Sequence, residues 1–400
     1  MKRKLLLVLA IVVVVAACAA LIACGGGGGG GESAGEKTFV IGIGGPFTDG
    51  AVDFGRGAKR AVELAVKQAN ESDEAKDLGI TFTTMDGDDQ SNPDKANPVA
   101  TAFVSNRDLV GVIGHFNTGV SVPASQVYNE NNVVQIAYGA TGVALTEQGF
   151  ANVFRTCARD DSQGPAAAES AINLGFKKAY IVDDSSPYGQ GIAEEFEKKY
   201  VELGGEVLGK ESTQQGQSDF APVVTKIRSL GPDVVFFGGT YDAPSGAGAL
   251  FAKQLADGGV DAPIMGGDGI REQSFIDEAG AGAEGSFATL PGDPIEQLAQ
   301  GQAFIDAYTD MFPGETPGGF DANAYDAANA LIKAVYKVAT ADGLDSVTTP
   351  AGREALIAAV AATNFEGVTG VVSFDAKGDT NNQSVTTYRV EDGAWVPVEF

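Results

Sequence analysis

Small polar residues follow several apolar runs of this chain, at positions where they could bind a small charged solute. The loop 114–119 lies between an apolar run and a helical pattern at 120–130, and it contains Asn117 and Thr118. Amides and hydroxyls at a helix N-terminus bind anions such as a carboxylate. We therefore predict an anion site here, with the alternative that Thr118 only caps its helix.

Other residues in equivalent positions supply groups for the rest of a solute. They are Gly139, Ala140, Thr141, Tyr188, Tyr241 and Asp268. Asp268 offers a carboxylate for a cationic group, and the others offer backbone carbonyls, a hydroxyl and aromatic rings. Each loop alone could be an ordinary connection. If the preceding runs are parallel strands, however, their carboxyl ends place all these loops around a common cleft.

Composition argues against catalysis, metals, nucleotide cofactors and nucleic acid. The one histidine, His115, excludes a multi-histidine metal site, and we expect it to be a structural hydrogen bonder. Gly42-x-Gly44 lacks the third glycine of a dinucleotide fingerprint, and no Gly-x-x-x-x-Gly-Lys-Ser/Thr loop occurs. A net charge of −26 repels nucleic acid and anionic lipid. We predict no catalytic residue, no metal and no cofactor.

The elements that must position these loops alternate between buried strands and amphipathic helices. Apolar runs predict parallel strands at 39–44, 80–85, 109–113, 133–137, 179–182, 234–237 and 287–290. Strands that alternate with helices form right-handed units with helices on both sheet faces. Because the series breaks at 155–163, we predict an α/β protein with two doubly wound parallel-sheet lobes.

The pattern after residue 290 predicts that the chain passes back through both lobes. Helical patterns at 296–311, 322–340 and 353–363 precede antiparallel strands at 371–374, 385–390 and 395–398. Several crossovers would form a multi-strand hinge. We assign 38–156 and 288–367 to the N-terminal lobe, and 157–287 and 368–400 to the C-terminal lobe.

The N-terminal residues predict export and lipid attachment. Three basic residues precede the apolar run 5–15, and Leu-Ile-Ala-Cys ends at Cys24 as in a lipoprotein signal. We predict a signal peptide at 1–23, lipidation of Cys24 and a glycine-rich tether at 24–37. The alternatives are an uncleaved membrane helix over 5–23 and cleavage before Cys18.

Four segments together resemble the leucine/isoleucine/valine-binding protein family of type I periplasmic binding proteins. They are 112–115 (Val-Ile-Gly-His) with its loop, 155–165 (from Arg to Gln-Gly-Pro), 188–191 (Tyr-Gly-x-Gly) and 236–239 (Phe-Phe-Gly-Gly). The resemblance extends from residue 39 to about residue 395. It implies the type I periplasmic binding protein fold and a protein that closes around an amino acid, serves an ABC importer and does no chemistry.

The resemblance also implies how an amino acid would be held. Thr118, the Asn117 backbone and Thr141 would bind the α-carboxylate. The Gly139 carbonyl, Thr141 and Asp268 would bind the α-ammonium. Tyr188 and Tyr241 would close over the ligand, and Phe54, Phe116 and Phe320 would line its side-chain pocket, although Phe54 could equally be a core residue.

Three departures from the family leave the identity of the ligand open, and one of them is an extra residue near Thr240-Tyr241 that blurs the alignment there. Asn117 stands where the family can have a small residue, and Asp268 stands where a glutamate can occur. An amide, a urea-like solute or another small carboxylate is the alternative to a branched-chain or related amino acid. We expect a lipoprotein anchored to the cell envelope that delivers its ligand to ABC permease subunits. The alternative from another class is a ligand sensor for a signalling partner.

Overall fold

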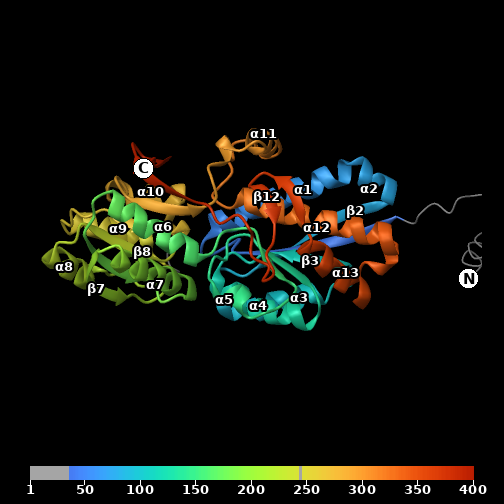
Figure 1. The fold of residues 1–400 in the computed structure, drawn as a ribbon, viewed down its shortest axis with the longest axis horizontal. Helices are drawn as coiled ribbons and strands as arrows, with labels where there is room; N and C mark the ends of the chain where they lie inside the picture. The colour runs from blue at the N-terminus through green and yellow to red at the C-terminus, as the bar shows by residue number, and fades with distance from the viewer. Residues whose placement is uncertain (1–35, 243–245) are drawn as a thin grey trace, which may run out of the picture. The chain divides into compact units, whose positions relative to one another are not determined.

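The computed structural model describes residues 36–242 and 246–400, and its strands form two main sheets (Figure 1). The first sheet is parallel, with the order β2-β1-β3-β4-β5. Its strands are β1 (Lys37–Gly45), β2 (Ile80–Asp88), β3 (Leu109–Ile113), β4 (Val134–Ala137) and β5 (Val153–Arg155).

The second sheet has the order β14-β13-β10-β9-β8-β6-β7. Its parallel strands are β6 (Lys178–Asp183), β7 (Glu206–Ser212), β8 (Val234–Gly238), β9 (Ile264–Gly266) and β10 (Phe287–Pro291). Two antiparallel strands extend it, β13 (Val385–Glu391) and β14 (Ala394–Pro397). The predicted α/β class with two parallel-sheet lobes is therefore confirmed.

Helices from distant parts of the chain cover the first sheet. They are α1 (Val52–Glu71), α2 (Asp73–Leu78), α3 (Pro93–Val104), α4 (Thr118–Glu130), α5 (Ala144–Glu147), α11 (Gly301–Met311), α12 (Asp321–Asp342) and α13 (Pro350–Ala361). In Figure 1 the blue α1 and the orange-red α12 lie side by side, and the two helices pack together. Ala58 and Val62 of α1 join Ile41 and Ile43 of β1 in one apolar core. The helical spacing of small apolar residues in α1 is what allows this close packing.

The second sheet has its own helices, which follow its strands along the chain. They are α6 (Asp160–Asn173), α7 (Pro187–Glu202), α8 (Ala221–Leu230), α9 (Gly248–Asp257) and α10 (Gln273–Ala279). Val223, Val224 and Ile227 of α8 are buried, as their helical spacing predicts. Among the described residues, no helix combines the length and apolar character needed to cross a bilayer.

Strand pairing places the crossovers between the lobes. β10 pairs with β9 through Ala288 and with β13 through Pro291, so the chain leaves the second sheet after this strand and not at residue 287. The hairpin of β11 (Asn364–Gly367) and β12 (Gly370–Ser373) is held by Asp326 of α12, which accepts from the Val368 and Thr369 amides. The C-terminal crossover therefore follows this hairpin and precedes β13.

Four strands and one helix start were not predicted. The four strands are β5, β7, β9 and β11. β5 has only three residues, and β7 is an edge strand whose residues are all at least partly exposed. Edge strands lack the continuous apolar run that marks a buried strand. α11 begins at Gly301 and not at residue 296, because a short 3-10 turn (Ile295–Gln297) comes first. Lys37, the last residue of the predicted tether, already pairs with Ile80. The predicted signal peptide and Cys24 lie outside the described residues.

A buried ion pair joins two of the crossover segments. Arg155 is fully buried at the end of β5, and its Nε donates to Asp379 Oδ1 at 2.6 Å. Its Nη1 donates to the carbonyls of Ala140 and Gly142 at 2.9 Å each. Burial acts to raise the pKa of Asp379, but Arg155 and Arg159 outweigh it and hold the pKa below its usual value. The pair therefore stays ionised and fixes the loop that contains Thr141.

We expect Arg155→Met to lower the free energy of unfolding by about 3–5 kcal/mol, because it leaves Asp379 buried without its main partner. Urea denaturation at neutral pH measures this loss. Lys210→Met is the matched control, since Lys210 pairs with Glu197 at the surface at 3.0 Å. Such a pair contributes about 0–1 kcal/mol. Equal losses in the two variants would contradict a special role for Arg155.

Candidate functional site

The loop after β3 leads directly into α4. The Asn117 carbonyl accepts from Ser121 N at 2.8 Å, and Thr118 is the first residue of the helix. His115 anchors the loop, because its Nδ1 lies 2.6 Å from Asp89 Oδ2 and its Nε2 lies 2.9 Å from the Tyr128 hydroxyl. All three side chains are buried. His115 is thus a structural hydrogen bonder, as predicted.

The loop after β4 lies against this helix start. Thr118 Oγ1 accepts from Gly142 N at 3.0 Å, so the hydroxyl ties the two loops together and does more than cap α4. Thr141 is buried, and its hydroxyl has no hydrogen-bond partner of normal geometry among the described residues. Arg155 holds the Ala140 and Gly142 carbonyls on either side of it. These contacts hold the backbone of the loop 140–142 in place, and they do not use the Thr141 hydroxyl.

Asp268 lies at the start of a 3-10 turn (Asp268–Ile270) after β9. Its Oδ1 accepts from Gln163 Nε2 at 2.7 Å and from the Tyr188 hydroxyl at 3.1 Å. The Tyr188 hydroxyl also accepts from Gly269 N at 3.0 Å. Burial raises the pKa of Asp268 well above its usual value, and the nearby Asp160 raises it further. Tyr188 therefore contacts and orients the predicted carboxylate.

Sequence reasoning missed Asp160, the first residue of α6. Its side chain is fully buried, and neither carboxylate oxygen has a hydrogen-bond partner of normal geometry among the described residues. Burial raises the pKa of Asp160 to about 7, although the Thr141 hydroxyl and Arg155 act in the opposite direction. An acidic residue opening a helix at the predicted break between lobes was the available signal, but helix N-termini commonly carry such residues.

Thr240, after β8, was also missed as a site residue. Its buried hydroxyl lacks a hydrogen-bond partner of normal geometry among the described residues. A cavity between the lobes is lined by Asn117, Thr118 and Gly119 on one side and by Tyr188, Asp184 and Thr240 on the other. The polar groups of both lobes thus face a shared space.

The predicted aromatic residues also come together. The rings of Phe54 and Phe116 stack with their centroids 4.3 Å apart, and Phe320 lies 5.9 Å from each. The Tyr241 ring lies 6.2 Å from Phe54, and its hydroxyl donates to Asp53 Oδ2 at 2.7 Å. Tyr241 therefore connects the second lobe to α1 of the first.

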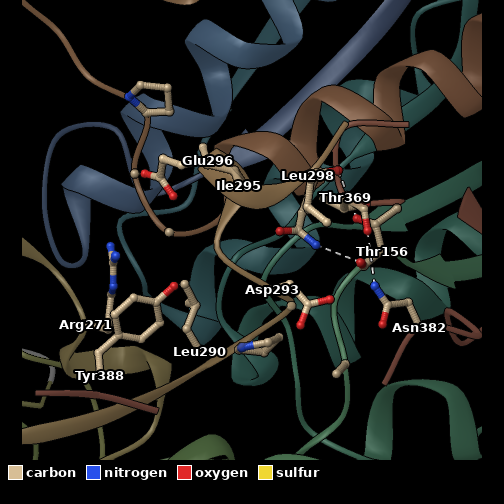
Figure 2. A pocket seen from close by; sticks show the side chains of 17 residues that line it. Thr156, Arg271, Leu290, Asp293, Ile295, Glu296, Leu298, Thr369, Asn382 and Tyr388 are labelled. Carbon is tan, nitrogen blue, oxygen red and sulfur yellow. Dashed lines mark hydrogen bonds between the residues drawn. The ribbon is translucent and has the colours of Figure 1, made fainter. Parts of the chain in front are cut away.

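A separate cavity lies where the crossover segments pass one another (Figure 2). Thr156, Leu290, Asp293 and Asn382 line it, together with Tyr388 of the second sheet. None of the predicted ligand residues is among its lining residues. This is a hinge cavity, distinct from the interlobe cavity that Thr118, Tyr188 and Thr240 line. Among the described residues, no cluster of three or more histidine, cysteine, aspartate or glutamate side chains could hold a metal ion.

Comparison with known proteins identifies relatives over almost the whole described chain. Residues 38–394 match the family described as periplasmic binding protein. The chain is 34% identical over 357 residues to Leu/Ile/Val-binding protein homolog 1 of Brucella abortus, covering 89% of this chain and 91% of that protein.

Solved structures share the fold. The leucine-binding protein LivK of Thermotoga maritima has a TM-score of 0.80 at 25% identity, covering 90% of this chain and 98% of that one. The branched-chain amino acid substrate-binding protein LivJ of Streptococcus pneumoniae, in complex with isoleucine, has a TM-score of 0.77 at 26% identity. That match covers 90% of this chain and all of LivJ. The fold predicted from the resemblance is thereby confirmed.

The raised pKa of Asp160 predicts that the free energy of unfolding of the ligand-free protein depends on pH. A folded protein with a raised aspartate pKa binds more protons than its unfolded chain, so ionisation destabilises it as the pH rises from about 4 to about 7. We expect Asp160→Asn to raise the Tm of the ligand-free protein at pH 8 and to have little effect at pH 4. Thermal unfolding followed by circular dichroism measures both.

Asp161→Asn is the control for this experiment, because Asp161 is the next residue in the chain but is 39% exposed. We expect a smaller change of Tm with pH for that variant. A gain in Tm for Asp160→Asn that is the same at both pH values would contradict the assignment.

Proposed function

Because this chain belongs to the leucine/isoleucine/valine-binding protein family of type I periplasmic binding proteins, we propose that it binds an amino acid between its lobes for an ABC importer. One observation carries the proposal. Buried polar atoms without hydrogen-bond partners of normal geometry belong to Asn117 and Thr240, which line the interlobe cavity, and to Thr141 and Asp160, which lie on the loop bonded to Thr118 and on the helix start next to it. Each such atom costs about 1–3 kcal/mol. A zwitterion that satisfies them favours the closed state.

The α-carboxylate of the ligand fits the start of α4. The first-turn amides of a helix point outward and favour an anion. The Thr118 hydroxyl accepts from Gly142 N, so its own proton is free to be donated to the ligand. Asn117, which differs from the small residue of the family, places a buried amide oxygen at the same end. This oxygen can accept a hydrogen bond from the ligand's ammonium or from a polar side chain.

The α-ammonium fits the carboxylates on the second lobe's side of the cleft. Asp268 and Asp160 are both buried, and the charge of Asp160 raises the pKa of Asp268 further above its usual value. An ammonium between them replaces this repulsion with two charge-assisted interactions. Asp160 thereby compensates for the methylene that Asp268 lacks relative to glutamate. The Gly139 carbonyl and Thr141 complete the coordination.

We expect Asp268→Asn to weaken amino-acid binding roughly tenfold or more, since a charge-assisted hydrogen bond contributes about 1.5–3 kcal/mol. Isothermal titration of the purified protein with leucine and with alanine measures the affinity. Asp293→Asn is the matched control, because Asp293 lines the hinge cavity and not the cleft. An unchanged affinity in Asp268→Asn for every amino acid that binds would refute the proposed ammonium site.

The N-terminal sequence supports export and anchoring of this binding protein. We propose that the signal peptide is removed, that Cys24 is lipidated, and that the glycine-rich segment tethers the body to the envelope. Mass spectrometry of the protein from its native membrane is expected to show a diacylated or triacylated Cys24 as the first residue. A native protein that begins at an unmodified Met1 would argue for an uncleaved anchor instead.

A further inference from the structure

Five aromatic rings pack together near the lobe interface, and we define them as the aromatic wall: Phe54, Phe116, Tyr138, Tyr241 and Phe320. The proposed function assigns the side-chain end of the ligand to this wall. All five residues are at most 3% exposed, and Phe320 and Tyr138 are fully buried. Phe54 and Phe116 are nearly parallel, at an angle of 14° and a centroid distance of 4.3 Å. Stacked rings at this separation are in direct contact. No part of a ligand fits between them.

The wall stands immediately beside the proposed ammonium site. A Cβ atom built on Gly139 would lie 2.5 Å from the Phe116 ring and 3.5 Å from the Phe320 ring. The Gly139 carbonyl is a proposed acceptor for the ammonium, so the ligand Cα lies close to this backbone. The ligand side chain then meets the face formed by Phe116 and its neighbours within one or two carbons.

Contacts on every side hold the rings of the wall in place. Phe116 packs between Phe54, Tyr138 and Phe320. On the side of the second lobe, Asp53 Oδ2 accepts hydrogen bonds from the hydroxyls of Tyr241 and Ser274. Tyr241 is thereby fixed against Phe54. Room for a branched side chain would require several close-packed rings to move together and this interlobe contact to break.

We propose that the aromatic wall restricts this protein to small neutral amino acids, such as alanine and serine, and disfavours leucine and isoleucine. The inference rests on the proposed function, because it takes the cleft as an amino-acid site. A pocket that is open at this end gains affinity with each added methylene. Here added carbons overpack the rings, so the usual preference for the larger side chain is reversed.

Isothermal titration of the native protein with alanine, serine, valine and leucine tests the order of affinities. We expect alanine or serine to bind roughly tenfold more tightly than leucine. Phe116→Ala is expected to raise the affinity for leucine relative to alanine by roughly tenfold or more, because leucine then fills the space left by the ring. Phe54→Leu is a milder second variant, expected to shift the same ratio in the same direction if Phe116→Ala does not fold.

Phe82→Ala is the matched control, because Phe82 is a buried phenylalanine of the same lobe that packs with Phe39 and Tyr336, away from the cleft. It should leave the ratio of the leucine and alanine affinities unchanged. Leucine binding to the native protein as tightly as alanine would overturn the size restriction and leave the proposed function standing. Absence of binding by every amino acid would overturn the proposed function, and the restriction with it.

Discussion

The buried contact between Arg155 and Asp379 is the constraint on which the binding geometry depends. Arg155 ends the last strand of the first sheet, and Asp379 precedes the return of the chain to the second sheet. The guanidinium also holds the two carbonyls that flank Thr141. One side chain thus fixes a hinge segment relative to the loop of Thr141, which the proposed function assigns to the ligand. The desolvation of both charges is offset by Arg155 and Arg159 donating to the same carboxylate.

In contrast, Asp160 and Asp268 are two buried carboxylates to which no described arginine or lysine donates a hydrogen bond. Asp160 and Asp268 lie close enough to raise each other's electrostatic energy, and the described residues offer Asp160 no hydrogen-bond partner of normal geometry. Functional sites commonly retain such destabilising groups because the ligand supplies what the protein lacks. Under the proposed function, the ammonium of the ligand relieves this repulsion, and the energy so released contributes to its affinity.

Sequence reasoning predicted the fold where burial leaves a continuous apolar run, as in β1, β3 and β8. It missed β7, because an edge strand shows no such run, and β5, because three residues carry too little pattern. For the site, the loops after the strands led to Thr118, Thr141 and Asp268. The same reasoning could not find Asp160, since its importance comes from burial opposite Asp268, which depends on how α6 packs. Nor could spacing show that the phenylalanine rings contact one another and leave no open space.

The hydrogen bonds that Tyr241 and Ser274 donate to Asp53 affect how the contact between the lobes responds to salt. A carboxylate held by two neutral hydroxyls closes the lobes without pairing opposite charges across the opening. Ions in the medium weaken exposed ion pairs far more than they weaken contacts of this kind. The strength of this interlobe contact should therefore depend little on the ionic strength of the medium.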